Sequence, residues 1–361
     1  MVLTFGEIML RLCPRGKDLL LQSFPGKLET SFGGAEANVA VSLSMLGLPA
    51  RYITAMPNNQ IAQACLIQLR GLGVDVDSVK TVEGSRLGVY YVESGANQRP
   101  SKVVYDRANS AIATTKFEDY NFEKALEGVK RVHISGITPA ISEVAADAAI
   151  KLARLAKSKG IKISFDLNFR NKLWKWREGI DARTLAREVV PQILENVDLV
   201  IGNEEDAFDV LGIKSGGSDV HSGKLDFDAY ANTAREIAKR FSSVKKVAFT
   251  LRESFSAFHN NWGAILYDVE SDKSVLAPTR DGAYKPYEIK NIVDRVGGGD
   301  SFAAGLIYGL DSGDFSNDSD ALEFAVASSC LAHSINGDYN FVPKADVLAL
   351  MKGSGSGRVQ R

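Results

Sequence analysis

From about residue 130 onward, short apolar runs alternate with segments of helical periodicity. The run RVHIS at 131–135 predicts a buried strand, and apolar positions every three or four residues over 143–159 predict a helix that ends at Gly160. The run KISFD at 162–166 predicts the next strand. The alternation continues with strands at 197–203 and 245–251 on either side of a helix at 204–211. Strands that alternate with helices predict an α/β fold with a mainly parallel sheet and helices on both faces.

The first third of the chain has a different pattern. Strand-like alternation occurs within 7–32 and 86–106, and helices are predicted between these segments at 34–47 and 61–73. Two separated strand-rich segments beside one α/β core predict a small β-sheet lid, formed by about 15–32 and 86–106. Such a lid would cover a site or pair with another subunit. We expect a homodimer or a dimer of dimers joined through it.

Composition narrows the range of partners. The 361 residues carry a formal net charge of -1 and 45% hydrophobic residues, which gives no electrostatic reason to expect nucleic acid or an anionic membrane. Residues 1–350 are predicted to form one domain, with a polar surface loop at 213–228 and a mobile tail at 351–361. The three cysteines form no CxxC pair, and no apolar run approaches the ~20 residues of a membrane span. We therefore expect a cytoplasmic protein with reduced thiols.

The strongest local motif is DRVGGGDSFAAG at 294–305. A helix is predicted from about residue 300, directly after Gly297, Gly298 and Gly299. Glycines at a helix N-terminus let an anion approach the free backbone amides closely, so Asp300 would lie beside a bound phosphate and could act as a general base. The alternative is a tight turn followed by an acidic residue that complements the helix dipole, and the local sequence leaves both interpretations open.

A second glycine motif, GGAEANVAVSLSMLG at 33–47, precedes another predicted helix. Gly34 would lie at its start, and Asn38 in its first turn could hydrogen-bond a polyol. A plain turn and helix cap is the alternative. Neither motif is a Walker loop, because neither contains Gly-Lys. Gly26-Lys27, which follows an apolar run, has Leu21 where the first glycine of a Walker loop belongs. If ATP is used, the chain binds it without a P-loop.

Together these two motifs resemble the N-terminal and C-terminal signatures of ribokinase-like (PfkB) carbohydrate kinases. The resemblance covers residues 2–350 and implies a three-layer α/β/α core with a β-sheet lid, and ATP-dependent phosphorylation of a sugar. It further implies that Asp300 takes the proton from the sugar hydroxyl. By the same resemblance, the amides of Gly297, Gly298 and Gly299 would form the anion hole for the transferred phosphoryl group.

The sequence departs from the family pattern in places that concern the nucleotide. Arg295 stands where the family usually has Thr or Ser, and no glycine follows the strand VAFTL. The family's NxxE motif, linked there to Mg²⁺, appears with Asp as its last member, so the resemblance implies Mg²⁺ near Asn203 and Asp206. Residues on the nucleotide side would be the following: Asp166, Asn168, Arg170, Asn203, Thr250, Arg252, Gly297 and Gly299.

Other polar residues indicate the substrate class. Tyr105 and Arg107 are two apart on a predicted lid strand and therefore share a face, Tyr90 can be their neighbour, and Arg170 follows a core strand. A neutral hexose needs no pair of arginines, whereas a sugar acid offers a carboxylate that Arg binds through two hydrogen bonds. In the alternative interpretation, Arg170 contacts nucleotide phosphates and Arg107 is solvated.

The elements YxRxxSA and DLNFRxxLW resemble 2-keto-3-deoxygluconate kinases within the family. The resemblance implies phosphorylation of that sugar acid at its 6-hydroxyl. It also implies that Gly34, Tyr90, Tyr105, Arg107 and Arg170 hold the substrate. A fructokinase is the alternative within the family, and a sugar-acid sensor without kinase activity is the alternative from another class.

Several further residues have weaker signals. Asp338 is a candidate for reaching the substrate, and we expect Trp174 and Trp176 to pack near the entrance of the site. The four histidines share no metal-ligand spacing, so we expect structural or surface roles for them. They are His133, His221, His259 and His333.

Overall fold

The structure is a computed structural model that describes residues 1–213 and 225–353. Most of the polar segment expected as a loop at 213–228, with His221, lies outside the described residues, as does most of the tail expected at 351–361. Within the described part, no helix is both long and apolar enough to cross a bilayer.

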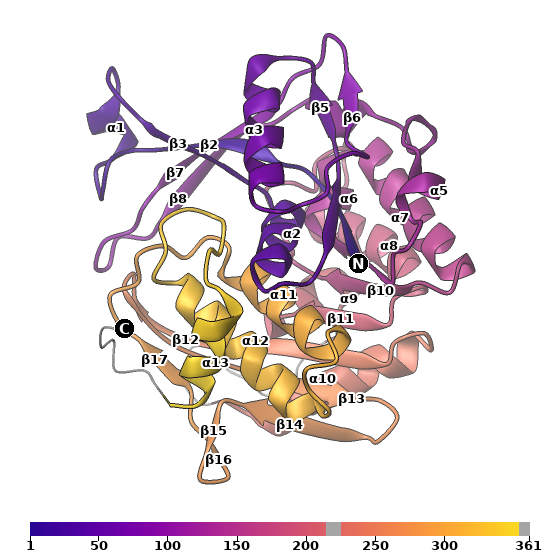
Figure 1. The fold of residues 1–361 in the computed structure, drawn as a ribbon, viewed down its shortest axis with the longest axis vertical. Coiled ribbons are helices and arrows are strands. Elements are labelled where there is room, and N and C mark those ends of the chain that lie inside the picture. The colour runs from indigo at the N-terminus through magenta and orange to yellow at the C-terminus, as the bar shows by residue number, and fades with distance from the viewer. Residues whose placement is uncertain (214–224, 354–361) are drawn as a thin grey trace.

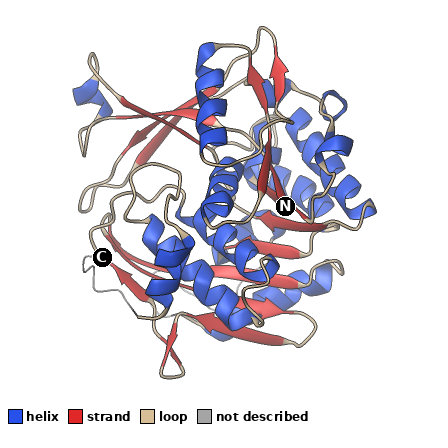
Figure 2. Cartoon of the chain, in the orientation of Figure 1, coloured by secondary structure: helices blue, strands red, loops and turns tan. Residues whose placement is uncertain are grey.

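The core of the described chain is a nine-stranded sheet (Figures 1 and 2). Six neighbouring strands are parallel, in the spatial order β4 (Ala50–Ile53), β1 (Val2–Phe5), β9 (Arg131–Ser135), β10 (Lys162–Asp166), β11 (Leu199–Gly202) and β12 (Lys246–Ser256). Three antiparallel strands complete it: β13 (His259–Asp268), β14 (Lys273–Ala277) and β17 (Tyr287–Ile289). The mainly parallel sheet predicted from the alternating pattern is confirmed.

Helices cover both faces of this sheet and make three layers. In β11, Val200 packs into one hydrophobic cluster, while its neighbours Leu199 and Ile201 pack into the other. The first cluster includes residues of α7 (Glu143–Ser158), α8 (Ala182–Leu194), α9 (Glu204–Leu211) and α10 (Phe227–Arg240). The second includes α2 (Ala35–Met45), α3 (Gln60–Gly71), α11 (Gly298–Asp311), α12 (Asp318–Ala332) and α13 (Lys344–Met351).

Short elements connect these layers. They are β5 (Ala55–Pro57), β6 (Lys80–Val82), α4 (Ala111–Thr114), η1 (Phe117–Asp119), α5 (Phe122–Ala125), α6 (Ile137–Ile141), β15 (Thr279–Arg280) and β16 (Ala283–Tyr284).

A separate four-stranded sheet forms the predicted lid and projects from one side of the core, with α1 (Leu20–Ser23) at its outer end (Figure 1). Its strands lie in the order β3 (Glu29–Gly33), β2 (Met9–Cys13), β7 (Gly88–Glu93) and β8 (Lys102–Asp106). The expected bounds of about 15–32 and 86–106 therefore omit β2, which pairs with both β3 and β7. Most of 15–28 is not strand but the connection between β2 and β3.

Candidate active site

A cavity of about 920 Å³ lies where the carboxyl ends of β10, β11 and β12 meet the N-terminus of α11 and the lid. Ligand sites of open α/β sheets form at this edge of the sheet. Every residue predicted from the sequence to bind substrate, nucleotide or metal lines the cavity. They are Gly34, Asn38, Tyr90, Tyr105, Arg107, Asp166, Asn168, Arg170, Asn203, Asp206, Thr250, Arg252, Gly297, Gly298, Gly299, Asp300 and Asp338.

The two tryptophans expected near the entrance do not line this cavity. Trp174 is 1% exposed and packs in the core between the sheet and its helices. Trp176 is half-buried against the same cluster and donates its indole N–H to the carbonyl of Pro139 at 3.2 Å. Trp174 therefore contributes to the hydrophobic core and not to the wall of the cavity.

The glycine motif turns the chain sharply into α11. Gly297 has φ 82°, in the left-handed region, and a Cβ there would lie 2.3 Å from the carbonyl oxygen of Asp338. Only glycine fits both demands. The helix begins at Gly298, two residues earlier than predicted, so Asp300 is its third residue and not its first. The first amides of a helix lack intrahelical acceptors, so those of 298–300 are free to donate to an anion, and we call them the cradle of α11.

One amide side chain joins the two glycine motifs. Asn38 donates from Nδ2 to Oδ2 of Asp300 at 2.6 Å, and its Oδ1 accepts from the backbone N–H of Gly34 at 3.2 Å. Asn38 is 2% exposed, so its amide orients the carboxylate from within the protein. Burial raises the pKa of Asp300 to about 7, even though the Asn38 hydrogen bond opposes the rise. A carboxylate with such a pKa is suited to accept a proton near neutral pH.

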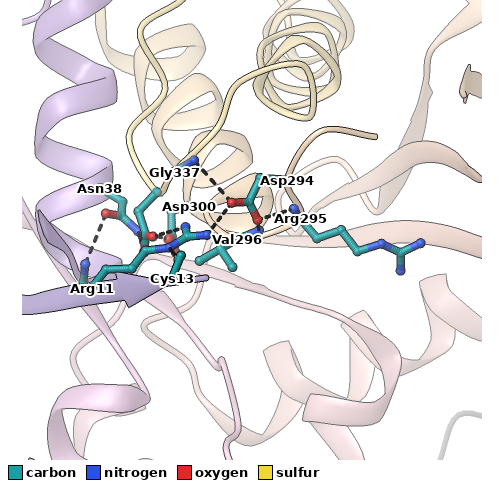
Figure 3. A network of polar contacts seen from close by, with 10 residues as sticks. Arg11, Cys13, Asn38, Asp294, Arg295, Val296, Asp300 and Gly337 are labelled. Atoms are coloured by element: carbon teal, nitrogen blue, oxygen red, sulfur yellow. Dashed lines mark hydrogen bonds and ion pairs between the residues drawn. The ribbon is translucent and has the colours of Figure 1, made fainter. Parts of the chain in front are cut away.

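A buried arginine that the sequence analysis missed connects the lid to the glycine motif (Figure 3). Arg11 of β2 contacts Asp338 at 2.6 Å and Asp294 at 2.5 Å, and its side chain is 2% exposed. Asp294 also accepts from the backbone N–H groups of Arg295 at 2.7 Å and Val296 at 3.1 Å, which fixes the turn before Gly297. The sequence signal for this contact was the position of Arg11 in the middle of the apolar run MLRLC. An arginine on such a strand is buried, and a buried arginine needs carboxylates beside it.

Arg107 also meets a carboxylate of the chain itself. It follows the last residue of β8, is 7% exposed and forms an ion pair with Glu7, so the interpretation of Arg107 as solvated was wrong. Glu7, 3% exposed, also accepts from the hydroxyl of Ser110 at 2.5 Å. The guanidinium carbon of Arg107 lies 5.3 Å from the ring centroid of Tyr105, so the ring and the guanidinium line the cavity together.

The cavity wall formed by the strand ends is rich in carboxylates. Oδ1 of Asn203 accepts from the backbone N–H of Asp206 at 2.9 Å, and Asp206 in turn accepts from that of Asn203 at 3.2 Å, so both residues cap α9. Burial raises the pKa of Asp206 to about 6. Burial, together with the charges of Asp206 and Asp300, raises the pKa of Asp166 well above its ordinary value. A cation bound at this wall would lower the pKa values of Asp166 and Asp206, because a nearby positive charge favours the ionised carboxylate.

Within 1–213 and 225–353, no three His, Cys, Asp or Glu side chains are positioned to hold a metal by themselves. The donors present at this wall are carboxylate and amide oxygens, which suit a hard cation such as Mg²⁺ that keeps water and phosphate ligands. The residues therefore fit a Mg²⁺ ion that arrives together with a nucleotide.

The described histidines fall into three environments. His133 is buried beside Ser164 at 3.0 Å, and His259 pairs with Glu288 at 3.2 Å. His333 lies behind Gly298 and lines the cavity, so its role is closer to the site than expected.

With this geometry established, comparisons with known proteins identify the family. Residues 1–345 match the pfkB family of carbohydrate kinases. The chain belongs to this family. A 2-dehydro-3-deoxygluconokinase from Thermotoga maritima is 40% identical and superposes with a TM-score of 0.87, over 98% of this chain and 99% of that one. The resemblance to PfkB kinases and the ribokinase-like fold predicted from it are confirmed.

Two further relatives are informative. A 2-dehydro-3-deoxygalactonokinase from Haloferax volcanii is 29% identical over 356 residues, which is 99% of this chain and 98% of that protein. A structure from E. coli described as a ribokinase II in complex with ATP and Mg²⁺ has a TM-score of 0.74, covering 98% of this PfkB kinase and 99% of that chain. At 20% identity the latter likeness shows the fold alone.

Proposed function

We propose that this PfkB kinase transfers the γ-phosphoryl group of ATP to the 6-hydroxyl of 2-keto-3-deoxygluconate, giving 2-keto-3-deoxy-6-phosphogluconate. The observation that carries the proposal is the arrangement of Asp300, held by Asn38 at the start of α11, in one cavity with Arg107 and Arg170. The 40% identical relative is named for phosphorylation of this sugar acid, which supports the same substrate.

The reaction uses groups at both ends of the cavity. The sugar carboxylate binds near Arg107 and Arg170, and Asp300 accepts the proton of the 6-hydroxyl as that oxygen attacks the γ-phosphorus of MgATP. The amides at the start of α11 stabilise the charge that develops on the transferred phosphoryl group, and ADP leaves. Lid closure over the sugar excludes water that would otherwise compete as acceptor.

The strand ends hold the nucleotide in this proposal. Asn168, Asn203, Thr250 and Arg252 line that part of the cavity, and Asn203 and Asp206 lie where the Mg²⁺ of MgATP would be bound. The likeness in fold to a kinase solved with ATP and Mg²⁺ supports this assignment.

A second candidate substrate is the epimer 2-keto-3-deoxygalactonate. It is favoured by the relative named 2-dehydro-3-deoxygalactonokinase, which matches 99% of this chain. The two sugar acids share the carboxylate and the 6-hydroxyl, so Arg107, Arg170 and Asp300 would serve both. Discrimination would have to come from contacts to the hydroxyl that differs.

The test is a side-by-side assay of both sugar acids and of fructose with MgATP. We expect a large preference in kcat/KM for an acid over fructose, because a site built for a charge leaves its arginines unpaired with a neutral sugar. Phosphorus NMR of the product locates the phosphate at the 6-oxygen. Better turnover of fructose would favour a fructokinase, and tight binding of the acid without any ADP formation would favour a sensor.

We further propose that the lid joins two copies of the chain in a homodimer or a dimer of dimers, in the cytoplasm. Leu21 (89% exposed), Phe24 (53%) and Val104 (53%) give the lid exposed apolar side chains that a second copy would cover. Light scattering should detect at least a dimer, which Leu21→Lys weakens. Ile67→Lys, at a 68% exposed apolar residue of α3, serves as the control. A stable monomer at micromolar concentration excludes the dimer, and cell fractionation checks the location.

A further inference from the structure

Arg295 makes contacts that a smaller residue at its position could not make. Its side chain extends away from Asp294 and from the Arg11 network (Figure 3). Nε donates to the carbonyl of Ala257 at 3.0 Å, and a terminal nitrogen donates to the carbonyl of Ser256 and to Oδ1 of Asn260 at 3.2 Å. All three acceptors belong to residues 254–260, the turn and the last strand residues at the end of the β12–β13 hairpin, which we call the hairpin tip.

The hairpin tip is also attached to the lid. The backbone N–H of Ala257 donates to the carbonyl of Asn97 at 2.9 Å, in the loop 94–101 that connects β7 and β8. A second contact lies beside the first, where the ammonium of Lys17 is 5.2 Å from the ring centroid of Phe258. Arg99 of the same loop donates to the carbonyl of Lys17 at 2.7 Å. The lid loop and the hairpin tip are therefore joined through backbone and side chains.

We propose that Arg295 is a positioning residue that couples the lid to the anion-binding cradle of α11. Arg295 precedes Gly297 by two residues, and its backbone N–H is held by the carboxylate of Asp294. A shift of the hairpin tip is therefore transmitted through the side chain of Arg295 to the start of α11. The planar guanidinium suits this task because several of its N–H groups point in fixed directions. Thr or Ser, the residues expected from the family pattern, would be too short to reach these carbonyls.

The catalytic consequence of this coupling rests on the proposed function, in which the cradle stabilises the transferred phosphoryl group. When the lid closes on the sugar, the contacts from Asn97 through Ala257 to Arg295 move the amides of the cradle into position to bind the transferred phosphoryl group. The competing explanation is that Arg295, which also lines the cavity, binds a phosphate group directly. The two explanations differ in what happens to nucleotide binding when no sugar is present.

Hydrogen–deuterium exchange of the ligand-free protein tests the coupling without any substrate. We expect Arg295→Met to raise exchange several-fold in three separate segments: the lid loop 94–101, the hairpin tip, and residues 295–301, where the amides of Arg295, Val296 and Ser301 are hydrogen-bonded. Arg51→Met is the matched control, because Arg51 also donates to two carbonyls, those of Ala125 and Glu127, but does not line this cavity. Should Arg295→Met not fold, Arg295→Lys, which keeps the charge and loses the planar group, replaces it.

Kinetics supply the second readout. Arg295→Met should lower kcat by about 10- to 100-fold, since misplacing catalytic groups by about 1 Å can cost that much. The Kd for MgATP measured without sugar should stay unchanged, and Arg295→Lys should recover part of the kcat. A parallel loss of MgATP affinity would assign Arg295 to direct phosphate binding and overturn the proposal. Exchange confined to the hairpin tip would overturn it as well. Failure of the proposed function would instead appear as a wild type that phosphorylates neither sugar acid.

Discussion

At the lid end, Arg107 in the cavity wall and Arg11, which does not line the cavity, form ion pairs with carboxylates of the chain itself. At the strand end, Arg170 and Arg252 line the cavity and form no ion pair with any described residue. The lid-end arginines are nearly inaccessible, with Arg11 at 2% and Arg107 at 7% exposure. The strand-end arginines are exposed. At the lid end, the arginine charges are therefore compensated before any ligand binds. At the strand end, the arginine charges are available to a ligand.

The carboxylates show the same contrast. Burial raises the pKa of Asp338 at the lid end, and the ion pair with Arg11 opposes that rise. Burial raises the pKa values of Asp166 and Asp206 at the strand end too, and there the charge of Arg170 opposes the rise without forming an ion pair. The fold thus organises the lid end in advance, although this buries charges, while the strand end keeps arginines without ion pairs, as the proposed binding of Mg²⁺ and phosphates there requires. This suits a site that must recognise one sugar by shape and bind a highly charged nucleotide reversibly.

The largest effect is expected at Asp300, where the two ends meet. Asp300→Asn keeps the size and the contact with Asn38 but removes the base, so kcat should fall by roughly 10²–10⁴-fold. Isothermal titration with the sugar acid and with MgATP should give near-normal affinities in the same variant. A variant with near-normal kcat would reduce Asp300 to a residue of the helix N-terminus.

The comparison between the ends predicts unequal effects on stability. Arg11→Met leaves Asp294 and Asp338 buried without a cation and should cost ~3–5 kcal/mol in the free energy of unfolding. Arg170→Met removes an exposed arginine that forms no ion pair with a described residue and donates one hydrogen bond, to the carbonyl of Phe169, so it should change that free energy by about 1 kcal/mol or less, while it lowers activity. Urea denaturation of both variants measures the difference. Equal destabilisation would contradict the view that only the lid end is organised in advance.

Arg107 tests whether a compensated arginine still recognises the substrate. Arg107→Met should reduce kcat/KM for the sugar acid by the equivalent of ~2–5 kcal/mol, and the effect on fructose should be much smaller because fructose has no carboxylate. The single variant also leaves Glu7 buried without its partner. The double variant Glu7→Gln/Arg107→Met removes that charge, so whatever loss persists there belongs to recognition of the acid. If the double variant regains wild-type kcat/KM, Arg107 does not bind the carboxylate.

Much of the fold could be predicted because its signals are local. The strands β9 and β10 have the predicted bounds, since both segments carry β-branched or aromatic residues at alternating positions, Val132 and Ile134 in one and Ile163 and Phe165 in the other. The start of α11 was placed two residues late because three glycines are poor helix formers, yet at an N-terminus they occupy positions where helical hydrogen bonds are absent anyway. The strand β2 was left out of the lid because its role depends on pairing with distant β7.

The residues of the site could be listed from motifs, but their pairing could not. Arg11 is separated by 283 residues from Asp294 and by 327 from Asp338, and nothing in the local sequence of any of them indicates the others. The amide of Asn38 looked free to bind a polyol, and only the three-dimensional arrangement shows that Asp300 occupies it. Such contacts between distant segments decide which charges are available to a ligand.

The smallest effect expected concerns pH and sharpens the view of Asp300 as the point where the ends meet. Because burial raises its pKa to about 7, and because a base must be ionised to accept a proton, kcat/KM for the sugar acid should fall about tenfold per pH unit below the inflection. At saturating MgATP, the inflection of the pH profile should lie at or above about pH 7, since the negative charge of the nearby phosphates further disfavours the ionised form of Asp300.

The matched variant for this pH profile is Asn38→Ala. It removes a hydrogen bond that stabilises the ionised carboxylate, so its inflection should move to higher pH than that of the wild type under identical MgATP. The substrate carboxyl titrates far below this range and cannot produce the inflection. An inflection near pH 4 in the wild type, or one that Asn38→Ala leaves in place, would mean that the titrating group is not Asp300.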